Sequence, residues 1–318
     1  MDELARIAML AKILRSVGKA EGVETGIGDD AAVLAVPAGG AAGEGGAKLV
    51  WTIDEQVEGT HFRRELLSWR DVGWRSFMAA VSDVAAMGGE PWCALSALAL
   101  PADVDDAAVA ALVKGQAEAA EEASAPVVGG NLARGTVVSI TTTVLGKAAR
   151  PVLRSGAKAG DGLWLAGSVG LAAAGFRALT QGKGGDARLA AAVASWRLPR
   201  ALVAQGRAMA RTAHAAIDVS DGLARDVGHM AEASGVRIVI DEALLLGDEA
   251  IRAAAEALGD EPLGLALHGG EDYALAVTNE GALEGFRCIG EVREGRGLML
   301  RGAMGEREIE PEGFDHFR

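Results

Sequence analysis

The sequence is poor in cysteine and in aromatic residues. Its 318 residues include two cysteines, and Phe, Trp and Tyr together make up 4% of the chain. Cys93 and Cys288 lie far apart, without a CxxC motif or a neighbouring histidine cluster, so neither a disulfide framework nor a zinc site is indicated. This pattern suits the reducing cytoplasm. With so few aromatic residues, any core must be built mainly from Ala, Val and Leu.

Basic residues are outnumbered, since 31 Lys and Arg stand against 44 Asp and Glu and the formal net charge is −13. Such a chain repels phosphodiester backbones and anionic membrane surfaces, which argues against binding to nucleic acid or to a membrane. No apolar run reaches the roughly 18 residues of a membrane span. The start, MDELARIAMLAKILRSVGKA, lacks the basic segment and apolar core of a signal peptide. An anionic small substrate would need cations beside it.

Two common nucleotide-binding motifs are missing. The sequence contains neither GxxxxGK[ST] nor GxGxxG, which excludes the P-loop and Rossmann modes by their defining residues. Glycine, in contrast, is abundant: 44 residues, about twice the usual share of ~7%. Much of this glycine stands in short runs beside acidic residues, so these runs are the candidate functional segments.

The pattern of strands and helices predicts an α/β (α+β) fold of two domains. A hairpin is expected from strands 31–36 and 48–54, and Ser68 with Asp71 resembles a capping box that starts a helix ending at Gly88. Other expected helices are 1–20, 105–123, 169–181, 200–213 and 222–234; other expected strands are 92–100, 136–146, 163–167, 215–221, 236–241, 273–278 and 285–290. The segment 149–162, with a proline and glycines, interrupts this pattern, so the predicted domains are 1–147 and 148–318.

Five acidic segments stand at predicted strand or helix ends. They are GIGDDAAV (26–33), TIDEQVEGTHF (52–62), VSDVAAMGG (81–89), IDVSDG (217–222) and HGGEDYAL (268–275). Magnesium prefers oxygen ligands and is usually held by one or two carboxylates together with substrate phosphates. Carboxylates at several element ends therefore suit a metal-nucleotide site.

Each segment also has a simpler interpretation. Gly28 and the two following aspartates could form only a turn, Asp54 could end a strand in solvent, and His61 could be a surface histidine. Asp83 lies about 180° around its helix from Trp74, as an ordinary solvated carboxylate also would.

The IDVSDG segment combines capping and ligand chemistry. Asp218, Ser220 and Asp221 are all good helix caps. The two acids could nevertheless hold one metal while Ser220 or a helix N-terminal N–H meets a phosphate. GGNLARG (129–135) similarly offers glycines for close backbone approach beside Asn131 and Arg134.

Taken in order, these segments resemble the thiamine-monophosphate kinase family. The matching motifs are GIGDDAAV, DxxVEGTHF, SDVAAMGG, VGGN, RSGAKAGD, AIDVSDGL, GGEDYAL, CIGEV and GFDHF, which extend from residue 26 to 317. The family belongs to the aminoimidazole ribonucleotide synthetase-like superfamily. The resemblance implies a dimerising N-terminal α/β domain, a C-terminal α/β domain and an active site between them. It also implies that the γ-phosphate of ATP passes directly to thiamine monophosphate, with several Mg²⁺ ions and no protein nucleophile.

The resemblance also implies roles for individual residues. Positions that match magnesium ligands are Asp30, Thr52, Asp54, Asp83, Asn131, Asp218 and Asp221. Positions that match nucleotide contacts are Gly130, Asn131, Arg154 and Ser220. Positions that match contacts with thiamine phosphate are His61, Glu271 and Phe314.

Three positions depart from the family pattern. Asn131 replaces a usual Asp and keeps only a carbonyl oxygen as ligand, Ile53 replaces a usual Thr, and Val113 replaces a Tyr that commonly meets the base. Two alternatives therefore stay open: a nucleotide-binding homologue with weakened or lost catalysis, and another ATP-dependent enzyme of the superfamily. Selenophosphate synthetase and the hydrogenase-maturation dehydratase are disfavoured, because their characteristic cysteines are absent from the corresponding ends of this chain.

Overall fold

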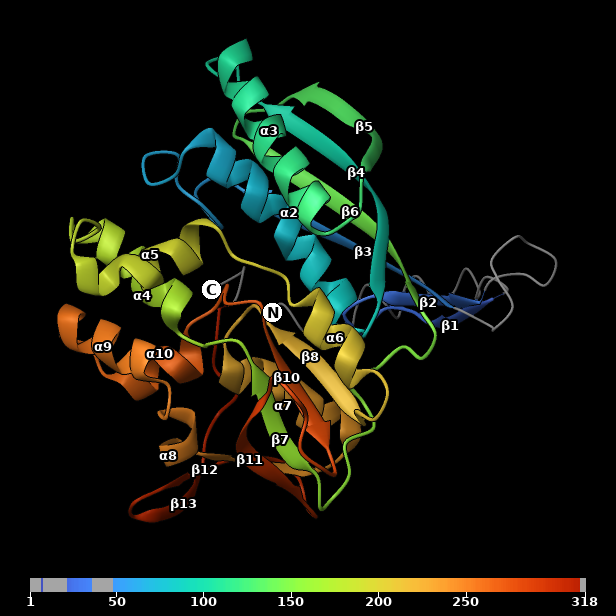
Figure 1. Cartoon of the computed structure of the whole chain (residues 1–318), viewed down its shortest axis with the longest axis vertical. Helices are drawn as coiled ribbons and strands as arrows, with labels where there is room; N and C mark the ends of the chain where they lie inside the picture. The colour runs from blue at the N-terminus through green and yellow to red at the C-terminus, as the bar shows by residue number, and fades with distance from the viewer. Residues whose placement is uncertain (1–6, 8–21, 36–47, 315–318) are drawn as a thin grey trace.

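The computed structural model describes residue 7 and the ranges 22–35 and 48–314. The expected opening helix and the Gly/Ala-rich hairpin loop before residue 48 lie outside these residues. Two β-sheets, each with its own helices, form two halves stacked one above the other (Figure 1). In the described ranges no helix is long and apolar enough to cross a membrane.

The first sheet has six strands in the order β1-β2-β3-β6-β4-β5. Its strands are β1 (Val23–Thr25), β2 (Ala32–Ala35), β3 (Lys48–Val57), β4 (Glu90–Leu100), β5 (Val127–Arg134) and β6 (Ser139–Ala148). β2 and β3 form the expected antiparallel hairpin, while β4 and β5 run parallel. β5 is an additional strand at the edge of the sheet. A Cβ on its Gly130 would lie 1.8 Å from the carbonyl oxygen of Ser96, so the sheet itself requires glycine there.

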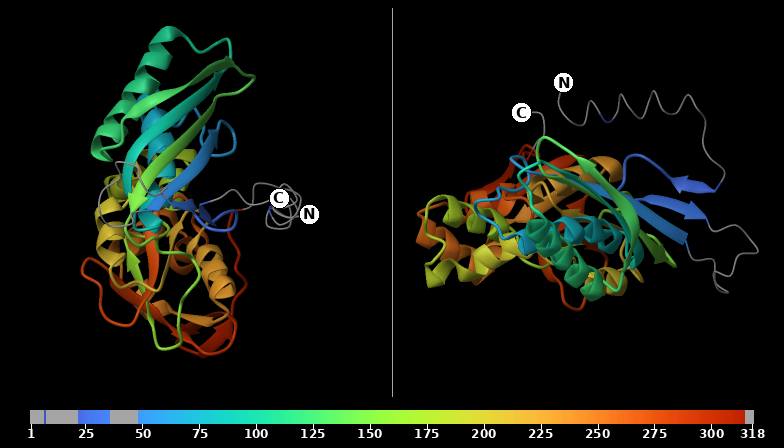
Figure 2. Two further views of the ribbon diagram at one scale, coloured as in Figure 1. Left: turned by 90° about the vertical axis from the view of Figure 1, so that its right-hand side faces the viewer. Right: turned by 90° about the horizontal axis from the view of Figure 1, so that it is seen from above.

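Two helices, α2 (Trp69–Ala86) and α3 (Asp106–Glu122), cover one face of this sheet (Figure 2, left). The predicted capping box is present: Ser68 Oγ accepts from the Asp71 N–H at 3.1 Å, and Asp71 Oδ2 accepts from the Ser68 N–H at 3.2 Å. Gly88, with φ +67°, follows the end of α2 as expected.

Helix α2 is buried on nearly all sides, because it lies between the first sheet and the second half of the chain. The simplest interpretation of Asp83 as a solvated carboxylate is therefore wrong. Helix α2 contacts β8 of the second sheet, and Asp83 lines a cavity between the two halves of the chain.

The second sheet has seven strands in the order β13-β12-β9-β11-β7-β10-β8. They are β7 (Gly162–Ala166), β8 (Ala215–Val219), β9 (Arg237–Asp241), β10 (Ala274–Asn279), β11 (Arg287–Arg293), β12 (Gly297–Gly302) and β13 (Gly305–Glu308). β9 and β12 run parallel, and the other pairs are antiparallel. Strands β7, β8 and β10 are rich in buried Ala, Val and Leu, as expected for a core with few aromatic residues.

The helices of the second half lie on both faces of this sheet and beside it. They are α4 (Leu171–Thr180), α5 (Ala190–Arg197), α6 (Val203–Met209), α7 (Leu223–Ser234), α8 (Glu242–Leu245), α9 (Glu249–Leu258) and α10 (Pro262–His268), with a 3₁₀ turn, η2, at Ala187–Leu189. α7 packs on one face, while α6 and the end of α2 pack on the other. α4, α5, α9 and α10 form a separate group, at the left of Figure 1.

Candidate active site

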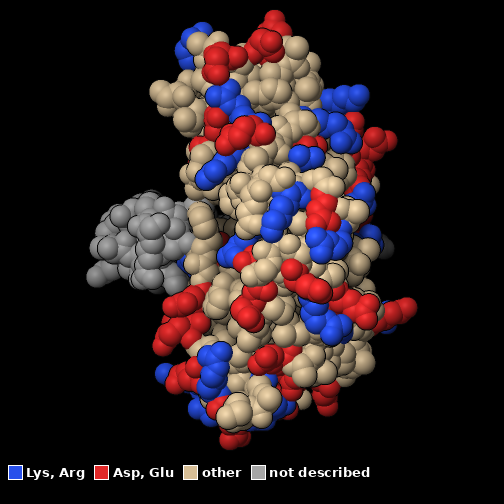
Figure 3. All heavy atoms as spheres, turned by 90° about the vertical axis from the view of Figure 1, so that its left-hand side faces the viewer, with Lys and Arg blue, Asp and Glu red and all other residues tan. Residues whose placement is uncertain are grey.

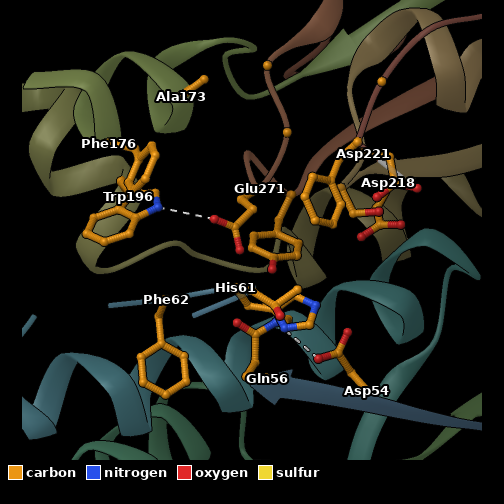
Figure 4. A pocket seen from close by; sticks show the side chains of 18 of the residues that line it. Asp54, Gln56, His61, Phe62, Ala173, Phe176, Trp196, Asp218, Asp221 and Glu271 are labelled. Carbon is orange, nitrogen blue, oxygen red and sulfur yellow. Dashed lines mark hydrogen bonds between the residues drawn. The ribbon is translucent and has the colours of Figure 1, made fainter. Parts of the chain in front are cut away.

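A cavity of about 810 Å³ lies between the two halves of the chain. Figure 4 shows three aromatic rings on one side of it, those of Phe62, Phe176 and Trp196. On the other side it shows the carboxylates of Asp54, Asp218 and Asp221. The cavity thus offers an apolar end and an acidic end, with residues from both sheets.

The geometry of β3 and the packing of α2 position the side chains of the acidic end. Thr52 and Asp54 alternate with exposed residues along β3 and so point toward α2. Thr52 Oγ1 donates to Asp83 Oδ2 at 2.5 Å. One residue earlier on α2, Ser82 Oγ donates to Asp218 Oδ2 at 2.6 Å, which ties the helix to the end of β8.

A smaller cavity of about 150 Å³ adjoins the acidic end and is lined by Asp30, Arg154, Asp218, Ser220 and Asp221 among others. Arg154 pairs with Asp30 at 2.6 Å. The other carboxylate oxygen of Asp30, Oδ2, is buried without a hydrogen-bond partner. A buried oxygen of this kind favours a cation or a further donor at the same place.

The pKa values of the carboxyl groups at the acidic end are raised. Burial, reinforced by the charge of Asp218 and against the effect of Arg154, raises the pKa of Asp30 to about 7. Burial and the charges of Asp218, Asp30 and Asp54 raise the pKa of Asp83 well above its usual value. Burial likewise raises the pKa of Asp218. In the protein alone these carboxyl groups therefore hold their protons to higher pH than an exposed aspartate does, and a bound cation would favour their ionised form.

The remaining wall carries His61, Glu271 and Phe314. His61 Nδ1 accepts from the Val57 N–H at 2.9 Å, which assigns the proton of the neutral ring to Nε2. The rings of His61 and Phe314 are 6.5 Å apart.

Glu271 belongs to a buried polar cluster that the sequence did not reveal. Its Oε1 accepts from the guanidinium of Arg75 at 2.5 Å, and its Oε2 accepts from Trp196 Nε1 at 3.1 Å. Arg75 is 1% exposed and also lies 4.9 Å from the centre of the Trp196 ring. One signal was present in the sequence: Arg75 is the only charged residue between Asp71 and Asp83, in an otherwise uncharged helix segment. An isolated charge in such a segment indicates a buried partner.

Of the two phosphate donors considered at this segment, the Ser220 hydroxyl and an N–H near the start of α7, the structure disfavours the N–H groups of residues 220–222. The N–H groups of Ser220, Asp221 and Gly222 all donate to Asp226 Oδ2, at 3.1, 3.1 and 3.2 Å. The Ser220 hydroxyl and the two aspartate side chains still line the cavities.

The chain matches two family models that together span most of its length. AIR synthase related protein, N-terminal domain, matches residues 28–148, and AIR synthase related protein, C-terminal domain, matches residues 158–300. Thiamine-monophosphate kinase of Mycobacterium tuberculosis is 37% identical over 305 residues, 94% of this chain and 88% of that protein. Thiamine-monophosphate kinase of Aquifex aeolicus is 35% identical over 276 residues, 85% of this chain and 88% of that protein. This chain belongs to the thiamine-monophosphate kinase family.

A solved structure shows the same fold. AaThiL complexed with AMPPCP and TMP superimposes with a TM-score of 0.88 at 32% identity, over 99% of this chain and 97% of that one. The α/β architecture of two AIR synthase-like halves therefore extends to the whole described chain.

Gly130, Asn131, Ile53 and Val113 line neither the central cavity nor the smaller one beside it. Gly130 and Asn131 lie on the exposed edge strand β5. Ile53 points outward from β3 and is 69% exposed. Val113 lies on α3 beside a separate cavity of about 610 Å³. Within one chain, these residues are not brought together with the acidic end.

Proposed function

We propose that this protein transfers the γ-phosphate of ATP to thiamine monophosphate, giving thiamine diphosphate and ADP. The observation that carries this proposal is the cavity itself, acidic at one end and aromatic at the other, in a member of the thiamine-monophosphate kinase family. The acidic end suits metal-bound phosphates, and the aromatic end suits a flat organic ring system. Because AMPPCP is an analogue of ATP, the ligands named for the AaThiL complex agree with the proposed pair of substrates.

The acidic residues fit magnesium. No group of three His, Cys, Asp or Glu side chains in the described ranges converges as a ready-made metal cage. Magnesium does not need one, because it keeps waters and takes phosphate oxygens beside one or two carboxylates. The partnerless oxygen of Asp30 and the mutual repulsion of the buried aspartates support cation binding here. The proposed ligands are Asp30, Thr52, Asp54, Asp83, Asp218 and Asp221, with the Asn131 side-chain oxygen as a further candidate.

Bound Mg²⁺ would neutralise charge on the transferring phosphoryl group. The protein supplies the remaining help by positioning. Arg154 can exchange its contact with Asp30 for a phosphate oxygen, and the Ser220 hydroxyl faces the same small cavity. We assign no covalent role to a side chain, since an acceptor phosphate oxygen is already ionised at neutral pH.

The thiamine end of the substrate is proposed to meet His61, Glu271 and Phe314. Thiamine carries a positively charged thiazolium ring, so a carboxylate and the faces of aromatic rings suit it. Glu271 supplies the carboxylate, and Trp196 adds an aromatic face that is held in place by its bond to Glu271. The aromatic end therefore recognises the cation while the acidic end receives the phosphates.

We further propose that the chain works as a homodimer of two-domain subunits, with the domain border near residue 147, in the cytoplasm. Described helices cover one face of the first sheet, whereas Trp51, Ile53, Trp92 and Leu95 are exposed on its strands. An exposed apolar area of this kind supports pairing of two sheets. The cysteines are both unpaired, which agrees with a reducing compartment. Lys and Arg alternate with Asp and Glu over the face shown in Figure 3, so that face offers no basic surface to nucleic acid.

The assay is direct. Purified protein with ATP, magnesium and thiamine monophosphate should yield thiamine diphosphate and ADP in equal amounts. Thiamine, which lacks the acceptor phosphate, should not be converted. ATP binding without turnover would instead support the second candidate, a nucleotide-binding homologue with weakened catalysis, which the loss of a carboxylate at Asn131 favours. In that case Asn131→Asp should restore turnover and lower the magnesium concentration required.

A further inference from the structure

One buried carboxylate holds the backbone of the IDVSDG segment. Asp226 lies in the first turn of α7 and is 3% exposed. Its Oδ2 accepts three consecutive backbone N–H groups, those of residues 220, 221 and 222. An ordinary helix cap satisfies one or two such donors, so three on one oxygen is an unusually complete attachment. The position of the loop at 220–222 is therefore set by Asp226.

The carbonyl groups of the same loop hold two other parts of the cavity wall. Ser220 O accepts the N–H of Glu271 at 2.7 Å, and Asp221 O accepts the N–H of Phe314 at 3.0 Å. Immediately before the loop, Val219 O accepts the N–H of Tyr273 at 2.9 Å. The GGED segment and the segment near the end of the chain are thus attached to the loop that Asp226 fixes.

The two attached segments pack closely against the backbone of the loop. A Cβ on Gly270 would lie 2.5 Å from Ser220 O, and a Cβ on Gly313 would lie 2.4 Å from Asp221 O. Both segments reach the loop at backbone contact distance, so a shift of the loop must move them too. In this way a displacement at 220–222 would reach Asp218 and Asp221 at the acidic end, and Glu271 and Phe314 at the other wall.

We infer that Asp226 is a positioning residue for phosphoryl transfer, because its carboxylate fixes one loop to which both the acidic end and the thiamine end of the cavity are attached. The inference rests on the proposed function and adds to it a residue that borders the smaller cavity but whose Oδ2 is already occupied by three backbone N–H groups. Its role is geometric: the acceptor oxygen must stay where three N–H groups converge. A change that keeps this oxygen should be mild, and a change that moves it should be severe.

Three substitutions separate geometry from charge. Asp226→Asn keeps an acceptor oxygen at the same reach but removes the charge. Asp226→Glu keeps the charge but lengthens the side chain by one methylene. Asp226→Ala removes the acceptor. Asp105→Ala is the matched control, since Asp105 caps α3 by accepting the Ala108 N–H at 2.8 Å and does not line the cavity.

Asp226→Asn is expected to be the least impaired variant, and Asp226→Glu and Asp226→Ala are expected to be more strongly impaired. Asp226→Asn should stay within threefold of the wild type in kcat and in the KM for thiamine monophosphate. Asp226→Glu should raise that KM and the calorimetric Kd for thiamine monophosphate at least tenfold and lower kcat, although it retains the charge. Asp105→Ala should lower the thermal unfolding midpoint, because it removes a helix cap, and leave the kinetic constants unchanged.

Amide hydrogen exchange gives a readout that does not depend on turnover. Faster exchange in segments 218–222, 269–273 and 309–314 is expected for Asp226→Glu, with wild-type rates for Asp226→Asn and Asp105→Ala. The inference is overturned if folded Asp226→Glu matches the wild type, or if Asp226→Asn is the more impaired of the two, which would mean that the charge acts directly. Wild-type protein without turnover would refute the proposed function, while the exchange pattern would still decide the role of Asp226.

Discussion

Among single residues, Glu271 has the clearest dual role, since it faces the cavity and also neutralises a buried cation. Arg75 is almost fully buried, and Glu271 is its ion-pair partner. We predict that Glu271→Ala lowers the free energy of unfolding by about 3 kcal/mol, because it leaves a buried guanidinium without its counter-ion. Glu271→Gln should lose less, since an amide oxygen can still accept from Arg75. Urea unfolding followed by circular dichroism measures both.

An exposed ion pair is the control for this prediction. Asp103 pairs with Arg64 at 2.9 Å and is largely exposed. Asp103→Ala should leave the urea midpoint unchanged within error, because solvent screens such a pair. Equal losses for Asp103→Ala and Glu271→Ala would show that burial of Arg75 does not govern the effect.

The neighbouring residue, Asp272, makes stability depend on pH. Its carboxylate accepts the N–H groups of Gly170 and Ala172, and burial raises its pKa to about 7 from an ordinary 3.8. The folded state therefore retains a proton that the unfolded state releases near pH 4, and the associated stability is lost as pH rises from about 4 to about 7. One such proton contributes at most about 1.4 kcal/mol per pH unit in this window.

Asp272→Asn should flatten the fall in the free energy of unfolding between pH 4 and pH 7. The control is Asp186→Asn, because Arg188 lowers the pKa of Asp186 to about 2 and its effect lies below pH 4. Denaturation curves at half-unit pH intervals would measure both slopes. If Asp272→Asn has the same slope as the wild type, Asp272 is ionised in the folded protein across this range.

For single residues, the sequence predicted the polar side chains that line the cavity better than it predicted their burial and their neighbours. The motif order named Asp54, Asp83, Asp218, His61 and Glu271, and the cavity contains all of them. It did not reveal that Asp83 is enclosed, because helical periodicity cannot show that both sides of α2 are covered. The sequence also did not predict the aromatic end of the cavity, since an aromatic residue in the core and one that lines a cavity give the same sequence pattern.

Among the elements, the packing of α2 on α3 depends on two glycines. A Cβ on Gly73 would lie 1.9 Å from the carbonyl oxygen of Leu112, and a Cβ on Gly115 would lie 2.0 Å from that of Arg70. We predict that Gly115→Ala costs about 1–3 kcal/mol, because the added methyl group must push the two backbones apart. Thermal unfolding would detect this as a lower Tm.

Gly264→Ala in α10 is the matched control. Nothing lies within 4 Å of a Cβ at that position, so alanine should be neutral or stabilise the helix by up to about 1 kcal/mol. If Gly115→Ala behaves in the same way, the close approach of α2 and α3 is not tight in solution.

Elements with strong local signals were the predictable ones. The capping box of α2, the hairpin and the long strand β4 follow from caps and periodicity. β5 was missed because its two central glycines weaken any strand pattern. The helix expected at 200–213 is shorter in the structure, where α6 (Val203–Met209) packs against the end of α2.

For the whole molecule, the separation of Asn131 from the central cavity bears on assembly. The family resemblance assigns Gly130 and Asn131 to the nucleotide, yet both lie on edge strand β5, outside the residues that line that cavity. Strands β3 and β4 of the same sheet expose Ile53, Leu95 and other apolar side chains. Both observations agree if two first sheets pair and each subunit brings β5 to the other's nucleotide.

We therefore predict that Ile53→Glu yields a folded monomer with little kinase activity. A carboxylate at the centre of an apolar interface must be desolvated on association, which opposes pairing by several kcal/mol. Met304→Glu is the control, since Met304 is fully exposed in the turn between β12 and β13 and a charge there should change neither assembly nor turnover. Sedimentation velocity would give the mass, and the ATP-dependent assay would give the turnover. A fully active Ile53→Glu monomer would show that one chain contains the whole site, and Asn131 would then have no part in nucleotide binding.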